Sequence, residues 1–535
     1  MINALEARLE LLSESAQREL LNISRGIEKE GLRADSSHFI SQTNHPEVLG
    51  HTLTHSQITT DYSEALMELI TPVSQTVDQL MKDLSDVHCF VQSHLGEEVL
   101  WSGSMPCKID GNDSIRIAEF GDSNLGKLKH VYRKGLDARY GRIMQSIAGL
   151  HYNFSLPDAF WKEWQVVKGD TQPLQDFKSE QYFSLIRNFR RHSWLLMYLF
   201  GASPAADQSF LAGMRHPLQP FDDKGTWYLP YATSLRMGDL GYHSNAQSSL
   251  AICFNSLSNF THTLEEAIHK PYPAYEVMGT QKDGEYIQLN TNILQIENEY
   301  YSAIRPKRNA ESGEKPIHAL KQRGVEYIEV RCLDLNPYLP LGISDQQVRF
   351  MDAFLVYCLV ADSPVVSEKE CQALDWNFET VVNRGREPGL KLKTPAGEAP
   401  LKDLGLALLD EIGRVAAIFD DMHCKAADAG KAKSDDALAN NRYHGAIEEQ
   451  RSKLVQPELT PSASILSVMK SESLSWLEIV GELSFKHQQL SKQHCNDESI
   501  HEKYHVMAKE SFLKEQQLKD ADVSKFSEYM TQYLS

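Results

Sequence analysis

The stretch 326–331 places a carboxylate and a guanidinium on one face of a predicted β-strand. Side chains alternate along a strand, so Glu329 and Arg331 point to the same side, together with Tyr327. The apolar residues between them point to the other side, where they can seal a core: Ile328, Val330 and Cys332. Charges held against an apolar sheet must pair, bind an ion or meet a charged ligand. The stretch therefore predicts part of a polar binding site.

Other predicted strands offer polar faces of the same kind. Their polar side chains are Glu28 and Glu30, Asp61 and Glu68, and His151 and Asn153. Each face alone is typical of a solvated sheet surface. Five carboxylates and one imidazole on a single face would repel one another unless divalent cations joined them, and Mg²⁺ favours such oxygen ligands together with substrate phosphates. Combined with arginines, the set predicts metal-assisted phosphoryl chemistry.

The strands that must position these residues can be read from hydrophobic periodicity. Residues 23–35 predict a strand with a turn, and 150–156 alternate cleanly between apolar and polar. Residues 58–72 are ambiguous, because their carboxylates fall at helical spacing while the Thr-rich start and terminal Pro suit a bulged strand. Residues 289–308 predict a strand that runs into a loop bearing Tyr and Arg. Residues 228–242 predict a loop that contains Arg236.

The predicted helices lie mainly at the start of the chain and in its last third. Residues 5–21, 73–95 and 181–200 have helical apolar spacing, and the chain after 346 is mainly helical. Residues 431–441 are the best linker candidate. We therefore expect a catalytic body over 1–430 and a helical extension over 431–535, packed on that body or continuous with it.

A glycine-containing stretch imitates a nucleotide-binding loop. Residues 121–127 match the spacing G-x-x-x-x-G-K of a P-loop, but Leu128 follows where a hydroxyl is needed for Mg²⁺. The missing ligand argues against a P-loop.

Composition excludes several classes of protein. The chain has 535 residues, 41% hydrophobic and 24% charged, as in ordinary globular proteins. A net charge of −19 argues against binding to nucleic acid or anionic membranes. The N-terminus does not resemble a secretory signal, and the apolar runs 194–200 and 354–361 are too short to span a bilayer. Eight scattered cysteines without a Cys-x-x-Cys pair predict neither a disulfide framework nor a zinc site, and fit a reducing cytoplasm.

Eight ordered blocks carry a resemblance to the proteobacterial glutamate–cysteine ligases, also called γ-glutamylcysteine synthetases. The blocks are GIEKEGLR (26–33), ITTDYSEALMELITP (58–72), LGKLKHVYRKGL with YG (125–141), GLHYNFSLP (149–157), YLFGASPA (198–205), YLPYATSLRMGDLGY (228–242), NILQIENEYYSAIRPKR (292–308) and GVEYIEVRCLDLNP (324–337). The resemblance is colinear from about residue 20 to 370. It implies an α+β, glutamine-synthetase-like fold, in which a curved antiparallel sheet forms a funnel flanked by helices.

The resemblance also implies an activity. ATP would phosphorylate the γ-carboxylate of L-glutamate, and the amino group of L-cysteine would displace phosphate from the γ-glutamyl phosphate. The products would be γ-L-glutamyl-L-cysteine, ADP and phosphate, in the first step of glutathione biosynthesis. Mg²⁺ is the implied cofactor, with Mn²⁺ as an alternative. Feedback inhibition by glutathione is also implied. Separately, we expect a cytoplasmic monomer.

Residue roles follow from matching positions. Glu28, His151 and Glu329 resemble the ligands of one metal, and Glu30, Asp61 and Glu68 those of another. The remaining matches are phosphate-binding Arg236 and Arg331, Arg133 for the glutamate α-carboxylate, and Tyr132, Tyr242 and Tyr301 around cysteine. Two alternatives stay open from the sequence: a ligase that uses another amine, and a non-catalytic protein that binds divalent cations. The arginine beside Glu329 argues against the second.

Overall fold

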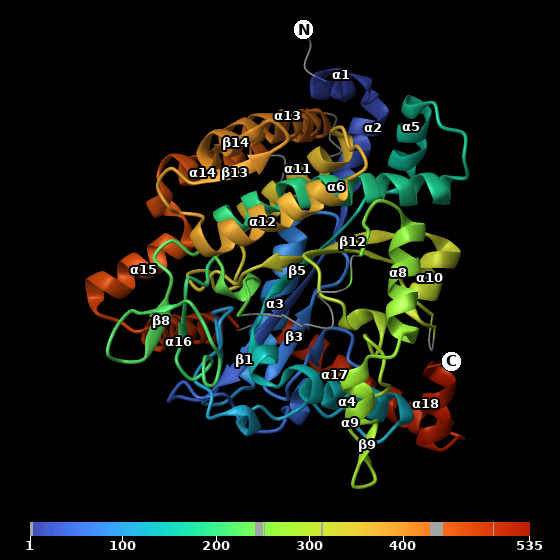
Figure 1. Cartoon of the computed structure of the whole chain (residues 1–535), viewed down its shortest axis with the longest axis vertical. Helices are drawn as coiled ribbons and strands as arrows, with labels where there is room; N and C mark the ends of the chain where they lie inside the picture. Colours follow the sequence, from blue (N-terminus) through green and yellow to red (C-terminus); the bar gives the residue numbers. More distant parts are fainter. Residues whose placement is uncertain are drawn as a thin grey trace.

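A seven-stranded antiparallel sheet forms the centre of the computed structural model, which describes residues 4–240, 250, 252–311, 314–428, 442–495 and 497–534. Six strands follow the order β11-β12-β5-β1-β3-β2, and β4 pairs with the end of β1. Their bounds are β1 (Ser24–Ala34), β2 (Ile58–Thr60), β3 (Leu66–Ile70), β4 (Val99–Leu100), β5 (Leu150–Ser155), β11 (Ile304–Lys307) and β12 (Tyr327–Leu333). The expected class, an antiparallel sheet flanked by helices, is confirmed (Figure 1).

Helices account for most of the remaining chain. Those of the first 360 residues are α1 (Ala4–Leu11), α2 (Glu14–Glu19), α3 (Val77–Ser93), α4 (Asn124–Tyr140), α5 (Asp158–Lys168), α6 (Leu174–Phe200), α8 (Leu257–His269), α9 (Pro273–Met278), α10 (Pro316–Arg323) and α11 (Asp345–Val360). Later helices are α12 (Glu368–Arg384), α13 (Leu401–Asp428), α14 (Arg442–Val455), α15 (Pro461–Glu472), α16 (Trp476–His494), α17 (Glu498–Ala521) and α18 (Phe526–Leu534). Among the described residues, no helix combines the length and the apolar character needed to cross a bilayer.

Among the residues that the structure describes, short strands form three small sheets outside the central one. They are β6 (Ala205–Asp207) with β7 (Gln219–Pro220) and β8 (Thr226–Tyr228), β9 (Gln281–Lys282) with β10 (Glu285–Tyr286), and β13 (Lys391–Thr394) with β14 (Gly397–Pro400).

One face of the sheet is apolar and faces the core. Ile27 lies opposite Tyr152, and Tyr152 lies opposite Val330, so the three side chains share this face. Helices α3 and α6 pack against it, and α11 packs on α6 (Figure 1). The Tyr152 hydroxyl donates to Asp352 of α11 at 2.7 Å, which satisfies a polar atom inside the core.

The opposite face carries the polar residues, as predicted. Glu28 lies directly opposite His151, and Glu329 lies opposite Asn153. A bulge between Val330 and Leu333 shifts the register of β12. The ambiguous segment 58–72 is a hairpin of β2 and β3, so its strand alternative is correct.

Two sequence predictions of secondary structure are wrong. The single helix over 5–21 is divided into α1 and α2, because the Ser13 hydroxyl accepts from the amide of Ala16 and starts a new helix. Residues 289–308 begin as a loop and end as β11, the reverse of the predicted order. The helices predicted over 73–95 and 181–200 are confirmed as α3 and the longer α6, and the mainly helical region after 346 is also confirmed.

The cysteine prediction is corrected as well. A disulfide joins Cys89 of α3 to Cys495 at the end of α16, with Cα atoms 5.6 Å apart. The two cysteines are 406 residues apart in the chain, so spacing gave no sign of the pair. The predicted linker 431–441 lies outside the described residues.

Candidate active site

Strand register brings three of the predicted metal ligands together around a fourth, His151. Its Nδ1 lies 3.3 Å from Glu28 and 3.7 Å from Glu329, and its Nε2 lies 3.6 Å from Glu30. Pairing of β1 with β5 and of β5 with β12 produces this arrangement, because cross-strand partners share a face. The side chain of Glu329 is 1% exposed, so its charge is held in the protein interior.

Glu68 and Asp61 extend the acidic cluster toward β2. Glu68 of β3 lies opposite Glu30 of β1, and its carboxylate is close to Glu28 and His151. Ligand atoms of Glu28, Glu68 and His151 all lie within 4.8 Å of one another. Asp61 follows β2 and lines the adjacent cavity. Glu68 was predicted to share a metal with Glu30 and Asp61. The structure places it beside Glu30 and also beside Glu28 and His151, which were predicted to bind the first metal.

The cluster is electrostatically divided. Burial, together with the carboxylates of Glu28, Asp61 and Glu30, raises the pKa of Glu68 well above its ordinary value. Burial opposes ionisation of Glu329 too, but Lys307, Arg331 and His151 lower its pKa well below the ordinary value. Like charges therefore accumulate beside β3, whereas cations surround Glu329.

This donor set fits a divalent cation. Several carboxylates and one imidazole converge on one face, and a bound cation would remove the repulsion between the carboxylates. Oxygen-rich sites with one imidazole suit hard ions such as Mg²⁺ and Mn²⁺.

The two predicted phosphate-binding arginines approach the cluster from different elements. Arg331 lies in the β12 bulge, where a bulge can redirect a side chain, and its Nη1 lies 3.2 Å from Glu329. Arg236 lies on a 3₁₀ turn (Leu235–Met237) and is 3% exposed. Its Nε donates to Asp334 at 2.8 Å and its Nη2 donates to the carbonyl of Leu333 at 2.8 Å.

A glycine gives Arg236 its room. A Cβ built on Gly149 would lie 2.7 Å from Nη1 of Arg236, so any other residue there would displace the guanidinium. The amide of Gly149 also donates to Glu30 at 2.6 Å. One backbone position therefore serves both the acidic cluster and the arginine.

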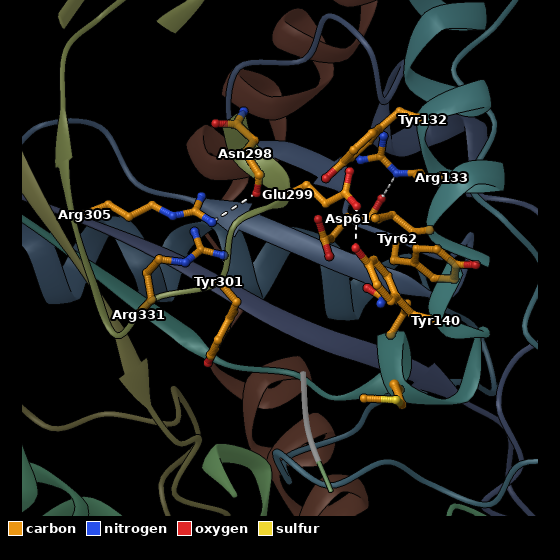
Figure 2. A pocket seen from close by; sticks show the side chains of 13 residues that line it. Asp61, Tyr62, Tyr132, Arg133, Tyr140, Asn298, Glu299, Tyr301, Arg305 and Arg331 are labelled. Atoms are coloured by element: carbon orange, nitrogen blue, oxygen red, sulfur yellow. Dashed lines mark hydrogen bonds between the residues drawn. The ribbon is translucent and has the colours of Figure 1, made fainter. Parts of the chain in front are cut away.

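A cavity of about 110 Å³ adjoins this polar face. Figure 2 shows that α4 contributes Tyr132 and Arg133, and that Arg331 and Tyr301 enter from the opposite side. Arg133 donates to the backbone carbonyls of Asp61 and Lys129 and stacks on Phe120 at 4.4 Å. The cavity thus has guanidinium groups at both ends and tyrosines between them, which suits a small zwitterionic or anionic ligand.

Tyr301 separates this cavity from a second one of about 420 Å³ that Arg236 lines. Its hydroxyl lies 3.0 Å from Sδ of Met237. Burial raises the pKa of the Tyr301 phenol, although Arg236 and Arg331 oppose this effect. Tyr242, the third predicted cysteine-binding tyrosine, lies outside the described residues.

Several cavity residues escaped the sequence analysis. Arg305 of β11 lies opposite Glu329 and donates to the carbonyl of Asn298 at 3.0 Å (Figure 2). Lys307 lies two residues later on the same strand, 3.4 Å from Glu329. Arg305 and Lys307 alternate with Ile304 and Pro306, a pattern that predicts a strand, but the segment was interpreted as a loop. Lys307 does not line the cavity. Besides Arg305, the missed lining residues are Tyr62, Leu136, Tyr140, Met144, Gln145, Asn298 and Glu299.

Comparison with known proteins agrees with this geometry. The family model for glutamate-cysteine ligase matches residues 9–381. Similar curated proteins include the glutamate–cysteine ligase of Hahella chejuensis, 51% identical over 100% of both chains. That of Pseudomonas entomophila is 47% identical over 99% of this chain and 96% of its own.

Solved structures agree with the fold as well. A glutamate–cysteine ligase from Francisella tularensis, solved in complex with AMP, superposes with a TM-score of 0.86 and 36% identity, covering 96% of this chain and 97% of that one. A bifunctional glutathione synthetase from Pasteurella multocida has a TM-score of 0.68 at 22% identity, covers 90% of this chain and 55% of its own, and so shares the fold. The glutamine-synthetase-like fold class is confirmed. On the family match and these identities, the chain belongs to the glutamate–cysteine ligase family.

Proposed function

We propose that the chain joins the γ-carboxyl of L-glutamate to the amino group of L-cysteine at the expense of ATP, the first step of glutathione biosynthesis. The observation that carries the proposal is the polar sheet face, where Glu28, His151 and Glu329 adjoin Arg331 and a cavity bounded by Arg133. Carboxylates beside arginines suit the transfer of a phosphoryl group to an acid.

The chain's own residues would divide the work by position. Arg331 and Arg236 would hold the transferred phosphoryl group and spread its charge. Arg133 would bind the glutamate α-carboxylate, and Tyr132, Tyr242 and Tyr301 would surround cysteine. Attack by the γ-carboxylate on the γ-phosphate of ATP gives γ-glutamyl phosphate and ADP. The cysteine amine then displaces phosphate.

Two cation sites are part of the proposal. Glu28, His151 and Glu329 would hold one ion, and Glu30, Asp61 and Glu68 the other, with Mg²⁺ or Mn²⁺ as the ion. Bound cations would neutralise the phosphate oxygens. The proximity of Glu68 to Glu28 and His151 is compatible with neighbouring ions that share a ligand.

Other properties complete the proposal. We expect a cytoplasmic monomer that glutathione inhibits, because the tripeptide contains both joined substrates. We also propose that residues 1–430 form the catalytic body, with 431–535 as a helical extension. Contacts of α16 and α17 with α3, and of α18 with α4, support an extension that packs on the body.

The decisive variant is Glu329→Gln. The expected result is a loss of cysteine-dependent ADP release by more than about 100-fold, since even residues behind the ligands of a metal site contribute 10- to 100-fold. The matched control is Glu326→Gln on the same segment, where the side chain is 40% exposed and lies 3.8 Å from Arg308. That variant should keep its activity.

The outcomes separate the parts of the proposal. Full activity of Glu329→Gln with a native circular dichroism spectrum would refute the metal assignment. Wild-type protein that turns over glutamate with other amines, but shows no cysteine-dependent turnover, would refute the substrate.

A further inference from the structure

Three histidines converge where α3 meets α17, away from the acidic cluster. His94 follows the last turn of α3, and His501 and His505 lie one turn apart on α17. The His94 ring centroid lies 5.7 Å from that of His501 and 5.4 Å from that of His505. Imidazoles that share one zinc ion at roughly 2.1 Å keep their centroids about 5 Å apart, so this spacing is close to that of a metal site.

In two of the rings, one nitrogen is hydrogen-bonded to a backbone carbonyl. His94 Nδ1 lies 2.7 Å from the carbonyl of Phe90, so that nitrogen donates its hydrogen and leaves Nε2 with a free lone pair. His501 Nε2 lies 3.3 Å from the carbonyl of Cys495, which in the same way leaves Nδ1 free. Metal-binding histidines usually donate the second ring N–H to a carbonyl or a carboxylate, which fixes the tautomer.

His505 completes the group of three rings around Phe90, with its ring centroid 5.2 Å from that of Phe90. All three rings are partly exposed, so an ion can reach them from solvent, and all three contact the ring of Phe90.

The spacing of the helix pair is a known ligand pattern. His501-Glu502-Lys503-Tyr504-His505 has the form H-E-x-x-H, in which two histidines four residues apart on a helix bind one ion. Glu502 points to solvent, so the pattern here suits a structural site without a catalytic base.

We propose that His94, His501 and His505 bind one transition-metal ion, with Zn²⁺ as the best match, and clamp α17 to α3. Three imidazoles favour zinc, copper or nickel over Mg²⁺, so this site and the acidic cluster would take different ions. A water molecule would be the fourth ligand. Among the described residues, the one group of three or more side chains whose ligand atoms all lie within 4.8 Å of one another is Glu28, Glu68 and His151. The nitrogens of the three imidazoles are not all this close to one another. Binding of one ion would therefore require the rings to rotate about their side-chain torsions.

The clamp would act on the active site through the C-terminal helices. Helix α17 leads into α18, and α18 packs on α4, the helix that carries Tyr132 and Arg133. The disulfide between Cys89 and Cys495 joins α3 to the end of α16, directly before α17 begins.

The test counts zinc on the full-length protein. Chelator-stripped protein is dialysed against micromolar ZnCl₂, and the metal retained per chain is measured for wild type and for His94→Ala, His501→Ala and His505→Gln. Each variant should lose one equivalent of zinc. The matched control is His262→Ala on α8, where an exposed histidine pairs with Glu266 at 3.4 Å. It should keep the wild-type count.

A second arm separates this site from the acidic cluster. His151→Ala should still show a zinc-dependent rise in melting temperature, and the double variant His151→Ala with His94→Ala should lose it. The proposal is overturned if all variants retain the wild-type zinc count. It is also overturned if the equivalent is lost with Cys495→Ser and kept in the histidine variants, since thiolates would then be the ligands.

Discussion

Asp334 is the residue that fixes Arg236. Its Oδ1 accepts from Arg236 Nε at 2.8 Å and from Ser234 at 3.0 Å, and its Oδ2 accepts from the Ala202 amide at 2.8 Å and from Ser203 at 2.6 Å. With four donors and 2% exposure, the carboxylate has no freedom to turn. Arg236 is therefore held in one orientation, as its proposed role of stabilising the transferred phosphoryl group requires.

Replacing Asp334 by Asn should lower kcat and leave KM nearly unchanged. The amide keeps the shape but loses the charge and must donate where the carboxylate accepted, so Arg236 becomes misaligned. A decrease in kcat of about 10- to 100-fold is expected, as for residues that orient metal ligands. Initial rates of ADP release at varied glutamate and cysteine would measure it.

The control for that variant is Asp345→Asn, which removes another carboxylate from a buried arginine. Asp345 accepts from Arg349 at 2.6 Å on α11, the helix that packs on α6 behind the apolar face of the sheet. Its kcat should stay at the wild-type value. If Asp334→Asn loses activity only in proportion to its folded fraction, Asp334 is structural and has no role in positioning Arg236.

Sequence reasoning was strong for the acidic residues and weak for those that support them. Alternation along a strand places Glu28 and Glu30, or His151 and Asn153, on one face without further information, because the period of two is a property of the backbone. Asp334 and Arg236 are about 100 residues apart in the chain, and the contact between them depends on how the loop that carries Arg236 folds back. Local pattern contains no signal for such a contact.

At the level of elements, the turn that precedes β2 depends on His55. The side chain is 6% exposed, and its Nδ1 accepts from the amides of Gln57 at 3.1 Å and Ile58 at 2.8 Å. Protonation of Nδ1 would replace both hydrogen bonds with repulsion. Burial and the nearby Lys514 lower the pKa of His55 to about 4.

The protein should therefore lose stability in mild acid through His55. In the unfolded chain a histidine titrates near 6.5, so between pH 6.5 and about 4 the unfolded state binds more protons and stability decreases as pH falls. His55→Asn keeps an acceptor for the turn but does not titrate. Urea unfolding at several pH values should give a flatter stability profile for this variant, by up to about 1.4 kcal/mol per pH unit.

Two comparisons make that measurement specific. His262→Asn changes an exposed histidine and should preserve the wild-type slope. An unchanged slope in His55→Asn would show that other groups cause the acid sensitivity.

Elements differed in how well periodicity predicted them. The segment 58–72 has carboxylates at helical spacing, but its Thr-rich start and terminal Pro suit a bulged strand. Pairing of β3 with β1 decided between the two, as tertiary contacts override local preference. The strand in 289–308 was placed at the wrong end. Ile304–Lys307 pairs with β12, and Pro306 concealed it, because proline is tolerated only on edge strands such as β11.

On the scale of the whole molecule, the C-terminal helices reach back to the N-terminal half. The sequence after residue 370 contains no motif that indicates a catalytic role. In the structure, α18 packs on α4 through a small apolar cluster of Leu128, Val131, Leu289 and Met530. Val131 precedes Tyr132 and Arg133 in the cavity wall. Such contacts between distant parts of the chain depend on the complete fold, so no single segment predicts them.

The last prediction follows from that packing. Met530 is 7% exposed against α4, and Met530→Glu would place a charge among apolar side chains. Helix α18 should detach while the central sheet stays folded, because local segments can open below the global unfolding free energy. Without α18, α4 would loosen; if Arg133 binds glutamate as proposed, KM for glutamate should then rise about tenfold, or about 1.4 kcal/mol. Val523→Glu, at a site that is 98% exposed just before α18, is the matched control and should behave as wild type. Equal kinetics for the two variants would mean that α18 does not support the glutamate site.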